Sequence, residues 1–128
     1  MLVTVYSFAR AGAVHVLVRV EVDSAPGKPS TIVLGLPEDW ARVSIRRVEE
    51  ALTALGFHLP TGRTVVNVLP IGIATDADGL ELPIAVGMLL STGQAKAPDQ
   101  LIVGDLSTGR NGAAERKLEN RPHHQVVI

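Results

Sequence analysis

The sequence predicts a two-layer α+β fold, with one mixed sheet and helices packed on one of its faces. Valines alternate with polar residues from Val14 to Val22, which is typical of a strand with one buried face. Later in the chain, one stretch has apolar residues at helical spacing and a second, mostly apolar stretch also predicts a helix. The elements come in the order β-β-β-α-β-α-β. Packing both helices on the valine-rich face of the sheet buries the apolar side of each layer.

The first third of the chain predicts strands. Residues 2–8 are rich in β-forming side chains, and the small residues 9–13 can turn the chain, so we expect a hairpin with the valine strand. The Pro and Gly content of residues 24–30 indicates a loop. Residues 31–34 form a short β-branched strand that closes on Gly35.

The strongest helix signal is "LPEDWARVSIRRVEEALTALGF", residues 36–57. Pro37 suits a first helical turn, and Gly56 is a natural stop. The expected apolar stripe consists of Trp40, Val43, Val48, Ala51, Leu52 and Leu55, and the other face carries Arg42, Arg46, Glu49, Glu50 and Thr53. Residues 64–69 predict the next strand, 82–90 an apolar helix that ends near Gly93, and 101–106 a last strand.

The length of 128 residues predicts one domain. Periodicity is lost after residue 107, so residues 1–107 are the expected domain and residues 108–128 a flexible tail. The apolar N-terminal stretch is interrupted by Arg10, His15 and Arg19, which argues against a membrane span. The absence of cysteine is compatible with a reducing compartment, so we expect a cytoplasmic protein without membrane partners.

Composition argues against several kinds of site. A net charge of -1 predicts no long-range attraction of the whole chain to DNA, and 3% aromatic residues leave few rings that could stack on bases. Neither GxxxxGK[ST] nor GxGxxG occurs, so we expect no nucleotide site. We also expect no cofactor.

Acidic residues and histidines offer two candidate metal sites. Asp76, Asp78 and Glu81 could supply oxygen ligands, but the further ligands of an EF-hand are missing. The histidines, which are His15, His58, His123 and His124, lack the close spacing of a zinc site. We therefore expect no metal, and solvated acids before a helix N-terminus.

Arg42, Arg46 and Arg47 form the basic cluster of the sequence. On a helix, Arg42 and Arg46 share a face that could hold a phosphate or the carboxylate of a partner. The alternative interpretation is that Glu49 and Glu50 neutralise Arg46.

A series of short motifs resembles the N-terminal domain of the magnesium-chelatase-like AAA+ proteins of bacteria, the ComM/YifB family. The motifs are "VTVYSFARAG", "VEVDSAPGKPSTIVLGLPE", "RVSIRRVEEALTALGF", "TVVNVLP", "LELPIAVGMLLSTGQ" and "LIVGDLS". The resemblance covers residues 1–107. It implies the fold of the Lon protease proteolytic domain, in the ribosomal protein domain 2-like superfamily, with a left-handed crossover. It also implies that family members continue into an AAA+ ATPase module and act as DNA helicases in branch migration during natural transformation.

The same resemblance places the serine nucleophile of Lon-type peptidases at Gly79, which has no side chain. The nearest hydroxyl is that of Thr75, and Lys117 is the candidate for the activating lysine. Covalent catalysis needs a nucleophile and a base within hydrogen-bond reach, so the resemblance implies a non-catalytic domain. Where the family has an acidic and a basic residue in the first helix, this chain has Val43 and Ile45, which predicts a more apolar surface.

We therefore expect an accessory domain that contacts another copy of the family or its AAA+ module, with DNA reached through the full assembly. Arg42, Arg46 and Arg47 are the expected contact residues, and the loop with Asp76, Asp78 and Glu81 is a second expected edge. Two alternatives are a degenerate Ser-Lys peptidase and an inactive remnant. The tail after residue 107 lacks Walker motifs, so the chain could be a fragment, a frameshifted product or a short protein.

Overall fold

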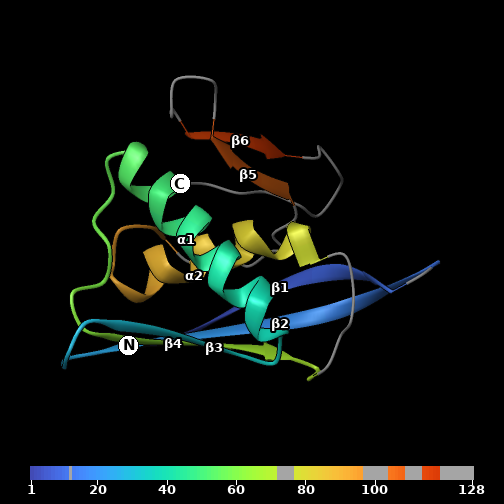
Figure 1. The fold of residues 1–128 in the computed structure, drawn as a ribbon, viewed down its shortest axis with the longest axis horizontal. Coiled ribbons are helices and arrows are strands. Elements are labelled where there is room, and N and C mark those ends of the chain that lie inside the picture. The colour runs from blue at the N-terminus through green and yellow to red at the C-terminus, as the bar shows by residue number, and fades with distance from the viewer. Residues whose placement is uncertain (12, 72–76, 97–103, 109–113, 119–128) are drawn as a thin grey trace.

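The computed structural model describes residues 1–11, 13–71, 77–96, 104–108 and 114–118. Its main sheet contains β1 (Leu2–Ala11), β2 (Val14–Ala25), β3 (Ser30–Leu34) and β4 (Arg63–Leu69), in the spatial order β1-β2-β4-β3. β2 is antiparallel to β1 and β4, whereas β3 is parallel to β4. Both α1 (Glu38–Ala54) and α2 (Glu81–Ser91) lie on one face of this sheet (Figure 1). The α+β class, the mixed sheet and the one-sided helices are therefore confirmed.

The predicted hairpin of β1 and β2 is present and longer than expected. Residues 9–11 continue β1 instead of turning, and Ala9 pairs with Val16. Ala9 is buried, so this small residue serves the core. The valine alternation holds for Val18, Val20 and Val22, which are fully buried, but Val14 at the far end of the hairpin is exposed.

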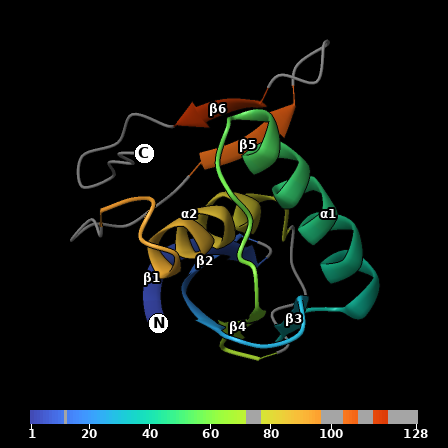
Figure 2. The same ribbon diagram turned by 90° about the vertical axis from the view of Figure 1, so that its left-hand side faces the viewer.

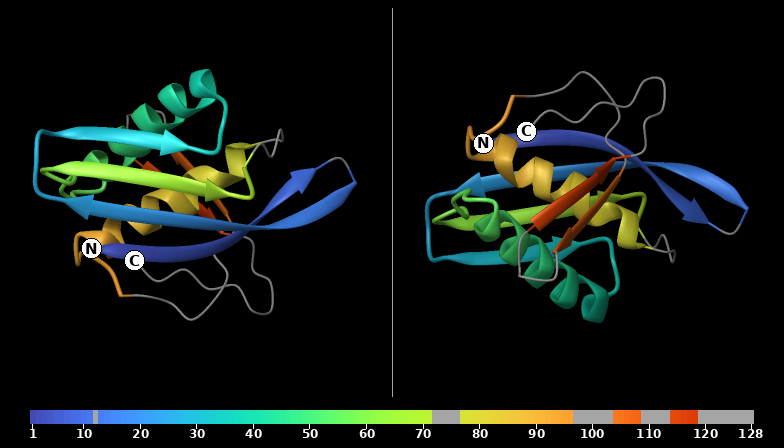
Figure 3. Two further views of the ribbon diagram at one scale, coloured as in Figure 1. Left: turned by 90° about the horizontal axis from the view of Figure 1, so that it is seen from below. Right: turned by 90° about the horizontal axis from the view of Figure 1, so that it is seen from above.

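The connection from β3 to β4 through α1 is a left-handed crossover. In the left panel of Figure 3 the sheet lies in front of the helices, and β3 and β4 both run from left to right. The chain leaves β3, passes behind the sheet through α1 and returns in β4, which is drawn directly below β3 (Figure 3). This hand is rare for parallel strands, and it agrees with what the family resemblance implies.

Helix α2 is the centre of the core. It follows the short 3-10 helix η1 (Ala77–Leu80), and all eleven of its residues are buried. It contacts β1 and β2 on one side and α1 and η1 on others. A Cβ atom at Gly87 would lie 2.5 Å from Val22 Cγ2, so glycine allows this close approach to the sheet.

Helix α1 is amphipathic and ends as the sequence predicts. Gly56 has a φ of 87°, and Phe57 N–H donates to Leu52 O at 3.0 Å, which is a glycine-stopped helix end. The buried residues of α1 are Ala41, Ser44, Ile45, Val48, Ala51 and Leu52. Val43, which the sequence placed in the apolar stripe, is exposed. Ile45, which we expected on the surface, belongs to the core, because it points toward the buried side of the helix.

A second, separate sheet was not expected. β5 (Gly104–Thr108) pairs with β6 (Ala114–Leu118) instead of extending the main sheet, so the expectation of one sheet was wrong. This hairpin lies on the side of the helices away from the main sheet (Figure 1), where β5 contacts α1, α2 and η1. Because α2 is apolar on all sides, the side that faces away from the main sheet must also be shielded from water, and the hairpin lies on that side.

Strand β6 lies inside the segment for which the sequence predicted a loose tail, and the flexibility of that segment stays a prediction. The predicted strand at residues 101–106 begins at Gly104 within the described ranges; residues 101–103 and 119–128 lie outside them. The boundary at residue 107 stays a prediction. Among the described residues, no helix is long and apolar enough to cross a membrane.

Candidate interaction surface

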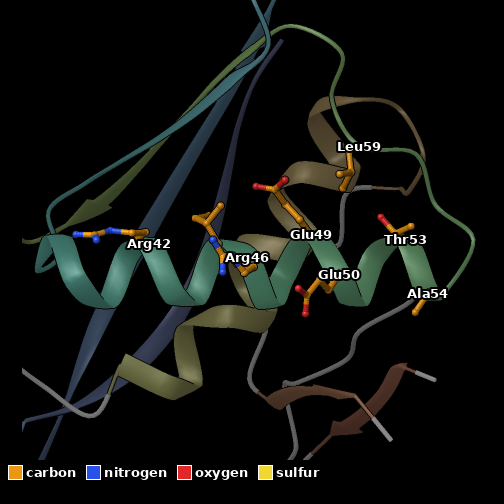
Figure 4. A pocket seen from close by; sticks show the side chains of 8 residues that line it. Arg42, Arg46, Glu49, Glu50, Thr53, Ala54 and Leu59 are labelled. Atoms are coloured by element: carbon orange, nitrogen blue, oxygen red, sulfur yellow. The ribbon is translucent and has the colours of Figure 1, made fainter. Parts of the chain in front are cut away.

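The three predicted contact arginines all lie on α1, but they do not share one environment. Arg42 and Arg46 are exposed one turn apart on a groove of about 630 Å³ that runs along the helix. Figure 4 shows both arginines toward one end of the groove and Thr53 with Ala54 at the other. The complete lining is Arg42, Ile45, Arg46, Glu49, Glu50, Thr53, Ala54 and Leu59. The groove therefore joins a cationic end to an acidic middle.

The charged side chains of this groove are mostly not paired with one another. Arg42 Nη2 lies 3.1 Å from Asp39 Oδ1, and both side chains are well exposed. Of the ion pairs within the described ranges, none includes Arg46, so the expected neutralisation by Glu49 and Glu50 does not take the form of a direct ion pair. Burial raises the pKa of the Glu49 carboxyl above its ordinary value.

Arg47 points toward α2 instead of the groove. Its Nη2 atom lies 2.5 Å from Glu81 Oε1, and the Glu81 side chain is only 4% exposed. The sequence assigned these two residues to two different interaction surfaces, whereas the structure joins them in an ion pair between α1 and α2. The sequence feature that could have indicated this ion pair is an acidic residue at the start of an apolar helix, because a buried carboxylate needs a cationic partner.

The rest of the acidic loop is described only in part. Asp76 and Thr75 lie outside the described residues, and Asp78 is described in η1 by its backbone alone. Within the described ranges, no three His, Asp or Glu side chains gather closely enough to hold a metal ion. His15 and His58 are exposed, and His123 and His124 lie outside the described residues. The absence of a metal stays a prediction.

The position that corresponds to the Lon-type serine is open. Gly79 lies in η1, and a Cβ atom there would meet nothing within 4 Å among the described atoms. Steric crowding therefore does not require glycine at this position. Lys117, the candidate base, lies on β6, and its side chain is outside what the structure describes.

Comparison with known proteins supplies the family. Residues 20–115 match the family described as subunit ChlI of Mg-chelatase. The chain is 36% identical over 96 residues to the competence protein ComM of Haemophilus influenzae, an alignment that covers 75% of this chain and 19% of that protein. It is 28% identical over 93 residues to the uncharacterized protein YifB of Escherichia coli, covering 70% of this chain and 18% of that protein.

A second YifB protein, from Salmonella typhimurium, is 28% identical over 109 residues, which cover 83% of this chain and 22% of that protein. The chain thus spans about a fifth of the length of the relatives it matches. The match to the family extends over three quarters of the chain and includes the β3–α1–β4 unit and α2. The chain belongs to the Mg-chelatase ChlI family and corresponds to the N-terminal domain of its ComM- and YifB-like members.

Proposed function

We propose that this chain is a non-catalytic accessory domain of a magnesium-chelatase-like AAA+ ATPase that remodels DNA in the cytoplasm. The observation that carries the proposal is the family match over residues 20–115. Its fold is that of the Lon protease proteolytic domain, an assignment supported by the left-handed β3–α1–β4 crossover (Figure 3). Gly79 at the serine position supports a non-catalytic role, because a hydrogen side chain supplies no nucleophile.

The groove on α1 is the proposed contact with a neighbouring subunit or with the ATPase module. Arg42 and Arg46 present two guanidinium groups one helical turn apart, which can each bind a carboxylate through paired N–H donors. Glu49 and Glu50 follow directly on the same helix, and they would repel a phosphate backbone. A groove with both signs of charge favours a protein partner, whose surface can offer both signs in return. DNA is then reached through the full assembly.

The test places this domain in the context of a relative. A chimera of Haemophilus influenzae ComM, with its matching segment replaced by residues 1–118 of this chain, which include the β5–β6 hairpin, is compared with ComM by sedimentation velocity in the presence of ATP. The unmodified chimera should assemble as ComM does. The Arg42→Ala/Arg46→Ala chimera should need at least about tenfold more protein to assemble, which corresponds to about 1.4 kcal/mol.

The control is Arg19→Ala/Arg63→Ala, which removes the same charge from exposed positions on β2 and β4. If both double variants assemble equally well, the groove is not the contact. If the unmodified chimera neither assembles nor associates, the chain is an inactive remnant and the accessory function is wrong. Labelling of the purified chain by an active-site serine probe would instead make it a peptidase.

A further inference from the structure

Among the residues that the structure describes, strand β3 pairs with β4 alone, which leaves the other side of its backbone open at the edge of the main sheet. Ser30 N–H donates to Gly62 O at 3.4 Å, and Ser30 is opposite Arg63 in the parallel register with β4. Because the backbone N–H and C=O groups of successive residues point to alternate sides of a strand, those of Ile32 also face β4. The N–H and C=O groups of Thr31 and Val33 therefore point away from β4, toward the open edge.

A groove of about 540 Å³ lies beside this edge, between β3 and α1. It is lined by Thr31, Ile32, Val33, Leu36, Glu38, Ala41, Arg42 and Ile45. Figure 2 shows α1 set beside the β3 edge, while α2 lies over β1 and β2 at the other side of the sheet. The helix wall of the groove combines the apolar side chains of Ala41 and Ile45 with the charged side chains of Glu38 and Arg42, and the strand supplies a hydrogen-bonding wall. The volume is within the range of ligand clefts, about 300–1,000 Å³.

The groove beside β3 has an acidic residue at the start of α1 and basic residues farther along the helix. Glu38 lies where α1 begins, and Arg42 lies one turn farther along, with Arg46 beyond it on the adjoining groove. The ion pair of Arg42 with Asp39 is between side chains that are 67% and 97% exposed, so an incoming carboxylate can replace it at little cost.

We propose that the open edge of β3 and the facing side of α1 bind an extended segment of a partner protein, which adds to the sheet as a fifth strand. Its backbone pairs with Thr31 and Val33, and every second side chain is apolar and packs between β3 and α1. An acidic side chain of the segment contacts Arg42. This binding mode takes its affinity from backbone hydrogen bonds and its specificity from alternate side chains.

The geometry favours a single strand over a second copy of this chain. Only a three-residue turn, residues 35–37, separates β3 from α1. A second copy that paired through its own β3 would bring its α1 to the edge that the first α1 already flanks (Figure 2). The site shares Arg42 with the proposed ATPase contact, but it differs from that contact in depending on backbone groups of β3. Peptide binding is therefore measured on the 128-residue chain alone, where Val33→Pro acts on the β3 edge.

The test uses a phage-displayed library of random octapeptides selected on the immobilised full chain. Selected peptides should be rich in β-branched residues at alternate positions and carry an acidic residue. Val33→Pro removes an outward N–H but no bond to β4, and it should weaken binding about tenfold, as should Arg42→Ala. Arg63→Ala is the control and should leave binding unchanged.

A second measurement does not depend on folding of the Val33→Pro variant. Synthetic versions of the selected peptide are N-methylated at either its odd or its even positions. Only one of the two sets should lose binding, by about tenfold, because alternate N–H groups of a strand face the same neighbour. Equal effects of both sets, or absence of any selected peptide, would overturn the proposal. So would a dimer of the wild-type chain that Val33→Pro dissociates.

Discussion

The two helices of this domain differ in how many of their residues are explained by packing in the core. Every residue of α2 is buried, and the helix contacts the sheet, α1, η1 and β5. Helix α1 buries one face, while its other face carries arginines and glutamates along a groove. The residues of α2 are accounted for by the core alone. The outer face of α1 is not, so it is where a partner can be sought.

The largest effect that separates the two helices should come from truncating an apolar side chain on each. Leu89→Ala in α2 removes a fully buried side chain from the core and should lower the free energy of unfolding by about 2–5 kcal/mol. Val43→Ala in α1 changes a side chain that is 58% exposed and should stay within about 0.5 kcal/mol. Urea denaturation of both variants measures the difference.

The slopes of the denaturation curves provide the control, because unchanged slopes show that both variants unfold from the same native state. A loss of several kcal/mol in Val43→Ala would mean that the side chain is buried in solution, and that α1 is already covered.

The sequence predicts an element of this fold well when the buried residues of that element recur at the regular spacing of a strand or a helix. The alternating valines of β2, the glycine stop of α1 at Gly56 and the apolar α2 all produce local patterns, and each was found within a few residues of its predicted bounds. The β5–β6 hairpin was missed because its pairing joins residues 104–108 to 114–118 on the far side of the helices, and neither strand shows strong alternation. Val43 was misplaced because helical spacing alone does not fix where the buried stripe ends.

The candidate site was predictable only in part. The sequence identified Arg42 and Arg46 from their spacing, and the structure places both on one groove. It could not identify the pairing of Arg47 with Glu81, because these residues are 34 positions apart and meet only when α1 packs on α2. The open edge of β3 was equally hidden, because strand order is decided by long-range pairing.

A smaller effect should distinguish the two neighbouring arginines of α1. Arg47→Met removes a cationic partner from a carboxylate that is 4% exposed and should cost about 1–3 kcal/mol, less than for a fully buried pair because Arg47 is half exposed. Arg46→Met should change the free energy of unfolding by less than about 0.5 kcal/mol. Thermal and urea unfolding of the two single variants measure this contrast.

The double variant Arg47→Met/Glu81→Gln completes the comparison. Removing the carboxylate charge as well should recover part of the loss, because the buried carboxylate charge that Arg47 neutralised is then gone too. Losses that simply add would show that the two residues stabilise the domain independently, and α1 would be held on α2 by apolar contacts alone.

The smallest effect concerns Glu49, the partly buried acid of the α1 groove. Burial raises its pKa in the folded state above the ordinary value of 4.5, so folding favours the protonated form. Well below pH 4.5 this carboxyl is neutral in both states; as the pH rises from there through the folded-state pKa, the folded state loses stability relative to the unfolded state. Glu49→Gln should therefore gain stability relative to the wild type between pH 4 and pH 7.

Urea denaturation at both pH values tests this, with Glu50→Gln as the charge-matched control from the same groove. If Glu50→Gln shows the same gain, the cause is the net charge of α1 and not the burial of Glu49. A gain confined to Glu49→Gln would mean that the groove holds a carboxylate at a cost to the fold. Binding of a cationic group of a partner at Glu49 would explain why a carboxylate that destabilises the fold is present on the outer face of α1. In α2, by contrast, the buried acid Glu81 is paired with Arg47 of the same domain.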